Sequence, residues 1–135
     1  MNIIPVTAAV ILKDDTVLLA QRSKGDPLED LWEFPGGKII PGESPEQCLV
    51  REIDEELAME IQVEDIFYAV SHSYPQGKNI LLLAYLCRHL QGEGQAKECQ
   101  DYRWVPLDRL ADYPMPEADW AIRNKILRKL TRINQ

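Results

Sequence analysis

The sequence lacks the features of secreted, disulfide-bonded and membrane-spanning proteins. Its 135 residues hold three cysteines, an odd number with wide spacing and no C-x-x-C pair. This excludes a disulfide framework and a zinc motif, and it favours buried, reduced thiols. The longest apolar run, Ile80 to Cys87, is far shorter than the ~20 residues that cross a bilayer. Residues 1–5 show neither a basic region nor a small-residue cleavage site, so we expect no signal peptide and a cytoplasmic location.

An excess of positive charge is absent too, because 22 Asp and Glu residues outnumber 15 Lys and Arg residues, for a formal net charge of -7. Nucleic-acid polymers and anionic membranes bind basic surfaces, so neither is expected as a partner. A small phosphorylated substrate is compatible with this charge, because divalent cations can bridge an acidic protein and a polyanion. The length predicts a single domain over residues 1–135, working as a monomer or a homodimer.

The sequence does contain a series of apolar segments of strand length, together with two helical patterns. Strands are predicted at residues 3–12, 16–21, 63–73, 79–87 and 102–105, loops at 23–33 and 39–43, and one helical turn at 107–110. Because strands and helices are mixed without strict alternation, we predict an α+β fold in which a mixed sheet lies between helices.

One helix is predicted from residue 45 to about Leu57. Ser44 can cap its N-terminus, Pro45 suits the first helical position and Gln47 completes a capping box. The residues on its predicted core-facing arc are Leu49, Val50, Ile53 and Leu57. A second helix should start near Glu117 and pack an apolar stripe on the sheet, formed by Ile122, Ile126, Leu130 and Ile133.

The first of these helices carries three carboxylates on one face. Glu52 lies one turn before Glu55 and Glu56, and like charges at this spacing destabilise a helix by roughly 0.2–0.5 kcal/mol per pair. A solvated acidic face explains them about as well as a bound cation such as Mg²⁺. The loop before the helix is hard to explain by solubility alone and favours the cation. Its residues of interest are Gly36, Gly37, Gly42 and Glu43.

The spacing of these residues resembles the Nudix box. Five residues separate a glycine from a glutamate, seven more lead to an Arg-Glu pair, and an apolar residue and a Glu-Glu pair follow. The matching residues are Gly37, Glu43, Arg51, Glu52, Ile53, Glu55 and Glu56. Ala58 stands where the family usually has glycine. If that glycine ends the helix in a left-handed conformation, alanine would cost about 1 kcal/mol there, which puts the local turn in doubt but not the carboxylates.

Residues 31–38, 44–47 and 116–119 are similar to the MutT branch of this family, including its 8-oxo-dGTP diphosphatase and CTP pyrophosphohydrolase types. The resemblance implies a Nudix-type α/β/α sandwich that hydrolyses a (deoxy)nucleoside triphosphate to the monophosphate and pyrophosphate. It implies Mg²⁺ as cofactor, with Mn²⁺ as a substitute, and a role in removing damaged nucleotides such as 8-oxo-dGTP. One alternative is a Nudix hydrolase of ADP-ribose or of a dinucleoside polyphosphate. Another is a non-catalytic, nucleotide-binding regulatory module, and the intact box carboxylates count against it.

The resemblance also implies roles for single residues. The implied metal ligands are Glu52, Glu55, Glu56, Glu98 and the carbonyl of Gly37. The implied catalytic residues are Glu52, Glu55, Glu98 and Arg51, with the general base left open because it differs across the family. The residues implied to hold the geometry of the box are Arg51, Glu43, Gly36 and Gly42. For Glu98, which lies in a polar loop, an ordinary surface role is an equal alternative.

Four residues are implied to bind the substrate. Arg22 and Lys38 are expected to contact the triphosphate, and Phe34 is expected to stack on the base. Asp119 is expected to read the base, with capping of the last helix as the alternative. An ionised Asp119 only accepts hydrogen bonds, which favours the amino groups of guanine or cytosine. The aromatic side chains expected to pack rather than to bind are Trp32, His72 and Tyr74.

Overall fold

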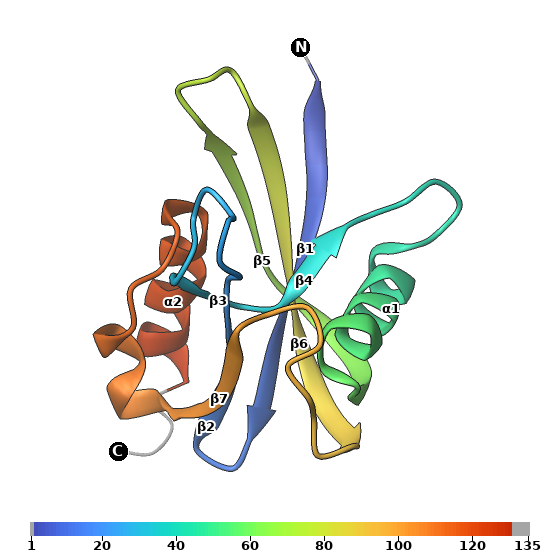
Figure 1. Ribbon diagram of the computed structural model, residues 1–135, viewed down its shortest axis with the longest axis vertical. Helices are drawn as coiled ribbons and strands as arrows, with labels where there is room; N and C mark the ends of the chain where they lie inside the picture. The colour runs from blue at the N-terminus through green and yellow to red at the C-terminus, as the bar shows by residue number, and fades with distance from the viewer. Residues whose placement is uncertain (1, 131–135) are drawn as a thin grey trace.

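A seven-stranded mixed sheet lies between two helices in the computed structural model, which describes residues 2–130 (Figure 1). The strands are β1 (Ile3–Lys13), β2 (Thr16–Gln21), β3 (Trp32–Glu33), β4 (Gly36–Lys38), β5 (Glu60–Ser73), β6 (Asn79–Gln91) and β7 (Asp101–Pro106). The helices are α1 (Pro45–Leu57), the 3-10 helix η1 (Leu107–Asp112) and α2 (Glu117–Lys129). The predicted α+β sandwich with a mixed central sheet is confirmed.

The sheet is organised around β1. Its strand order is β3-β2-β1-β6-β5, while β4 pairs with β1 and β7 pairs with β2. The pairing of β1 with β6 is parallel and extends from Ile3 opposite Asn79 to Leu12 opposite Arg88, and the other pairs are antiparallel. Both faces of β1 are covered, which explains why its apolar run does not alternate with polar residues.

Two hydrophobic clusters fill the space on the two sides of the sheet. On one side Ala8 and Val10 of β1 pack with Ile122 and Ile126 of α2, as the predicted stripe requires. On the other side the cluster includes Ala9 and Ile11 of β1 and Leu49, Ile53 and Leu57 of α1. Leu130 packs partly against the first cluster, and Ile133, the last member of the predicted stripe, lies outside the described residues.

The prediction that Val50 faces the core is wrong, since 42% of this residue is exposed. Cys48 is buried instead. Its thiol lies 3.3 Å from the hydroxyl of Thr7 on β1 and 3.6 Å from the carbonyl oxygen of Gly37 on β4. The face of α1 that packs on the sheet therefore contains Cys48 in place of Val50. This face is turned toward β1 and β4.

Two short strands were not predicted, one at the end of the predicted loop 23–33 and one just before the predicted loop 39–43. Trp32 and Glu33 pair with Gln21 and Ala20 of β2, and β4 pairs with β1. A Cβ on Gly36 would lie 2.1 Å from the carbonyl oxygen of Thr7, so only glycine lets these two strands approach this closely. The signal was missed because it depends on a partner strand distant in the sequence.

Both ends of α1 follow the local sequence. The Ser44 hydroxyl accepts from the Gln47 amide at 3.1 Å, and the Gln47 side chain accepts from the Ser44 amide at 2.9 Å, which confirms the capping box. Ala58 is left-handed, with φ 54° and ψ 40°, and its amide donates to the carbonyl of Asp54. The turn that the family makes with glycine is therefore kept, with an alanine in a conformation that disfavours a Cβ.

No helix within residues 2–130 is long and apolar enough to cross a membrane. The three cysteines are unpaired. Cys48 and Cys87 are buried as predicted, and burial raises the pKa of Cys87 to about 12. The prediction is wrong for Cys99, which is partly exposed.

Candidate active site

A cavity of about 460 Å³ gathers residues from both sides of the sheet. Its wall includes parts of β1, β4 and β6, the loop after β2, the turn between β5 and β6, and the start of α2. Eight of the predicted site residues line it, namely Arg22, Phe34, Gly36, Gly37, Lys38, Glu56, Glu98 and Asp119. This volume is in the range that holds a small organic ligand.

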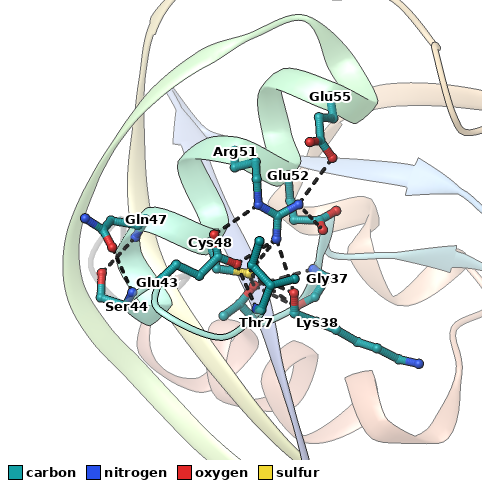
Figure 2. A network of polar contacts seen from close by, with 11 residues as sticks. Thr7, Gly37, Lys38, Glu43, Ser44, Gln47, Cys48, Arg51, Glu52 and Glu55 are labelled. Carbon is teal, nitrogen blue, oxygen red and sulfur yellow. Dashed lines mark hydrogen bonds and ion pairs between the residues drawn. The ribbon is translucent and has the colours of Figure 1, made fainter.

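The other charged residues of the box form a network around Arg51 (Figure 2). The guanidinium donates to both carboxylate oxygens of Glu43, at 2.7 and 3.0 Å. It also donates to Glu52 at 2.9 Å and to Glu55 at 3.3 Å. The hydrogen bonds from Arg51 hold the pKa of Glu43 at about 2. Arg51 and Glu43 therefore tie the loop before α1 to the helix itself.

The glycine that begins the box makes room for Glu52. A Cβ on Gly37 would lie 2.4 Å from the carboxyl carbon of Glu52, so any side chain there would displace this carboxylate. The carbonyl oxygen of Gly37 accepts from the Thr7 hydroxyl at 3.0 Å. Burial raises the pKa of Glu52, and the hydrogen bond from Arg51 opposes this rise.

Glu56 differs from the other box carboxylates because its side chain lines the cavity. Its Oε2 atom is buried and has no hydrogen-bond partner. Burial raises the pKa of Glu56 to about 9, and the negative charges of Glu33, Glu52 and Glu98 add to this rise. A buried oxygen without a partner among like charges fits a cation that would pair with it.

The three carboxylates of α1 have different surroundings in this structure. Within residues 2–130, no three side chains of His, Cys, Asp or Glu lie close enough together to form a metal-holding group. The reason is that Arg51 holds Glu52 and Glu55, whereas Glu56 faces the cavity. The donor set of carboxylates and carbonyls still suits a hard divalent cation, because Mg²⁺ binds oxygen ligands and retains several waters.

Arg22 lies in the cavity wall and is paired with two acids. It donates to Asp26 at 2.9 and 2.7 Å and to Glu33 at 2.6 Å. The hydrogen bond to Asp26, followed by the contacts with Glu33, raises the pKa of Arg22. Burial is the main cause that raises the pKa of Glu33, and Arg22 opposes this rise. Contact with a phosphate would therefore require Arg22 to exchange one of these partners. The exposed Lys38 also lines the cavity.

Asp119 is a buried acid at the cavity and does not cap α2. The N-cap of this helix is Pro116, which makes no side-chain cap hydrogen bond. The Asp119 carboxylate instead accepts from the Phe34 amide at 3.1 Å. Burial raises its pKa to about 8, which favours the protonated acid near neutral pH. A protonated Asp119, unlike an ionised one, both donates and accepts hydrogen bonds.

Phe34 and Tyr74, two aromatic residues near Asp119, lie in other surroundings than the sequence led us to expect. Phe34 is only 3% exposed and belongs to the hydrophobic core, although it is also one of the residues that line the cavity. Tyr74, expected to pack in the sheet, is half-buried and lines the cavity. Its ring meets His72 edge-on at 4.5 Å, and His72 lies 3.7 Å from Glu117 of α2. Trp32 is buried as expected.

Several residues of the cavity wall were not found from the sequence. They are Ser23, Asp26, Glu33, Lys78 and Cys99. Glu33 lies within the segment that resembles the MutT branch, and its position close to the box glycines could have indicated that it belongs to the site. The other four lie in loops or turns, where the sequence carries no periodicity that indicates the direction of a side chain.

The residues that line the cavity, except Val6, fall within the part of the chain that matches a known protein family. Residues 7–125 match the NUDIX domain. The CTP pyrophosphohydrolase of Escherichia coli (strain K12) is 41% identical over 120 residues, covering 88% of this chain and 87% of that protein. The 8-oxo-dGTP diphosphatase of the same organism is 31% identical, covering 86% and 89%. The solution structure of the E. coli ORF135 protein has a TM-score of 0.85 at 36% identity, covering 96% of this chain and 94% of that one.

Proposed function

Since the chain belongs to the NUDIX domain family and is a Nudix hydrolase, we propose that its substrate is a nucleoside triphosphate, cleaved to the monophosphate and pyrophosphate. The observation that carries this proposal is the cavity, which unites Glu56 of the box with the buried acid Asp119 and the aromatic ring of Tyr74. Glu56 suits a cation that binds phosphates, whereas Asp119 and Tyr74 suit a nucleotide base.

A divalent cation, Mg²⁺ or Mn²⁺, would be held by carboxylates of the box. The residues proposed as ligands are Glu52, Glu55, Glu56, Glu98 and the carbonyl of Gly37. When bound, such a cation neutralises phosphate charge and lowers the pKa of a water. The unpartnered, buried oxygen of Glu56 supports this assignment.

The chain's own residues would then divide the remaining tasks. Arg51 and Glu43 hold α1 against the preceding loop, and Arg22 and Lys38 offer positive charge to the phosphates. Glu98, Glu52 and Glu55 are the candidates for the base that takes a proton from the attacking water. Of these, Glu98 is supported by its position in the cavity wall.

A protonated Asp119 favours a nucleotide base that has a hydrogen-bond donor next to an acceptor. Cytosine offers an amino group next to a ring nitrogen, and guanine offers a carbonyl next to a ring N–H, so both suit a group that donates and accepts. We place cytosine triphosphates first, because the 41% identical relative is a CTP pyrophosphohydrolase. We place 8-oxo-dGTP second, in line with the relative that is an 8-oxo-dGTP diphosphatase.

The test is a panel of nucleotides with Mg²⁺, in which release of monophosphate and pyrophosphate is measured for wild type and Glu56→Gln. We expect turnover of CTP or 8-oxo-dGTP by wild type and a loss of at least about 100-fold in Glu56→Gln. Asp54→Asn is the matched control, since Asp54 is an exposed carboxylate of the same helix. Cleavage of ADP-ribose or of a dinucleoside polyphosphate, without turnover of any triphosphate, would contradict the proposal.

A further inference from the structure

Glu98 reaches the cavity on a loop that is fixed on both sides. This loop, residues 92–100, joins β6 to β7 and is called the strap below. Figure 1 shows it rising from the end of β6 and passing α1 before it turns into β7. The residues of the strap are mostly exposed, so hydrogen bonds rather than burial must decide where it lies.

On one side the strap is bonded to the end of α1. The Gln95 amide donates to the carbonyl of Leu57 at 2.8 Å, and the Lys97 amide donates to the carbonyl of Glu56 at 3.0 Å. The last carbonyls of a helix have no partner within the helix. The strap satisfies two of them and is thereby fixed relative to the residue that carries the unpartnered carboxylate.

Two glycines allow the strap to lie against this helix end. A Cβ on Gly92 would lie 2.7 Å from the carbonyl oxygen of Ala58. A Cβ on Gly94 would lie 2.5 Å from the terminal methyl group of Met59 and 2.9 Å from the hydroxyl of Tyr102. Both glycines have positive φ, 94° and 92°, a region that favours glycine. The close contact is thus built into the sequence of the strap.

On its other side the strap is bonded to the loop that follows β2. The Gln100 side-chain amide donates to the carbonyl of Arg22 at 2.8 Å and to the carboxylate of Asp30 at 2.5 Å. The Ser23 hydroxyl donates to the carbonyl of Glu98 at 3.0 Å. Gln100 therefore joins the backbone of the cavity-lining Arg22 to the segment that carries Glu98.

We propose that Gln100 is a positioning residue, whose side chain fixes Glu98 in the cavity by tying the strap to the loop after β2. The amides of Gln95 and Lys97 bind the same strap to α1. Glu98, Glu56 and Arg22 are therefore held in fixed positions relative to one another. This inference rests on the proposed function, because the position of Glu98 matters there for the attack on the phosphate.

The test is a double-mutant cycle on triphosphate hydrolysis, with Gln100→Ala and Glu98→Gln alone and together. Loss of an outer residue that orients a metal or catalytic group typically reduces activity 10–100-fold, so we expect Gln100→Ala to lower kcat by about 10-fold. KM should change less than about 3-fold, because Gln100 is not one of the residues that line the cavity. In the Glu98→Gln background Gln100→Ala should have no further effect, since coupled residues are not additive.

Two further variants separate positioning from general damage. Gln100→Glu keeps the shape of the side chain but removes both N–H donors, so it should lose at least as much activity as Gln100→Ala. Gln95→Ala is the matched control, an exposed glutamine of the same strap whose backbone amide, not its side chain, makes the described contact. Its kcat should equal that of wild type.

Unchanged kcat in Gln100→Ala, or an equal loss in the Glu98→Gln background, would overturn the inference. If wild type hydrolyses no triphosphate, the proposed function fails and hydrogen exchange decides the inference on its own. The amides of Gln95 and Lys97 should then exchange faster in Gln100→Ala than in wild type and Gln95→Ala. Equal exchange in all three proteins would overturn the role of Gln100.

Discussion

Two groups of carboxylates, one on and beside α1 and the other at the cavity, lie in different electrostatic surroundings. The paired group, Glu43, Glu52 and Glu55, is held by the guanidinium of Arg51, which keeps the pKa of Glu43 at about 2. The cavity group is Glu33, Glu56 and Asp119, of which Asp119 is buried and the other two are partly buried, and burial raises the pKa of each member. In the first group Arg51 supplies the positive charge, and its contacts with Glu43 maintain the shape of the box. In the second group Arg22 pairs with Glu33, whereas the buried Oε2 atom of Glu56 has no hydrogen-bond partner, which supports the proposal that a cation binds there.

The largest difference between the groups should appear in catalysis. Glu56→Gln removes a proposed ligand and should lower kcat by at least about 100-fold. Glu43→Gln only loosens the contact of Arg51 with the loop and should lower kcat by about 10-fold. Steady-state hydrolysis of the best triphosphate at saturating Mg²⁺ measures both. Equal losses would show that the two groups do not differ in function.

The next difference concerns stability against pH without divalent cations. A glutamate ordinarily ionises near pH 4.5, but Glu56 in the folded protein does so near pH 9. Between these values the unfolded chain binds fewer protons than the folded one, so the free energy of unfolding falls as pH rises. Glu56→Gln should reduce this fall by about 1 kcal/mol per pH unit, measured by denaturant unfolding in EDTA from pH 5 to 9. The control Asp54→Asn should follow wild type.

A smaller effect, on stability, is expected at the contact between Gly37 of β4 and Glu52 of the paired group. Gly37→Ala would place a Cβ against the carboxylate of Glu52. The displacement of this carboxylate that avoids the clash should lower the free energy of unfolding by about 1–3 kcal/mol. Lys38→Ala is the control, because Lys38 is the exposed neighbour of Gly37 in β4. Thermal unfolding of both variants at pH 7 tests this, and equal stability of Gly37→Ala and wild type would refute the close contact.

The smallest effect is expected at the end of α1. Ala58 has φ 54°, so Ala58→Gly should raise the free energy of unfolding by about 1 kcal/mol. Since Ala58 belongs to neither carboxylate group, kcat should not change. A loss of stability in Ala58→Gly, measured by denaturant unfolding, would contradict the left-handed turn.

Features decided by nearby residues were predictable from the sequence. Ser44 and Gln47 lie in one turn and mark the start of α1, and the apolar run of β1 indicates a strand covered on both faces. The spacing of the box indicated its residues, and the pairing of Arg51 with Glu43 follows from their charges once the loop folds back.

Features decided by distant parts of the chain were not predictable. β4 exists because Gly36 can approach Thr7, and Cys48 replaces Val50 in the core because α1 is turned toward β1. The protonation of Asp119 depends on burial, which only the folded chain defines. The same holds for Tyr74, which lines the cavity through a turn whose direction no local pattern indicates.

The central claim is that Glu56 is a ligand of the divalent cation, whereas Glu43 only maintains the shape of the box. Its most direct test is proton release on binding of Mg²⁺ or Mn²⁺ at pH 7, measured by calorimetry in buffers of different ionisation enthalpy. A carboxylate ligand must be ionised to bind a metal, so wild type should release close to one proton per cation and Glu43→Gln should do the same. Glu56→Gln should bind more weakly and release none. Release that persists in Glu56→Gln, or no release from wild type, would contradict the claim.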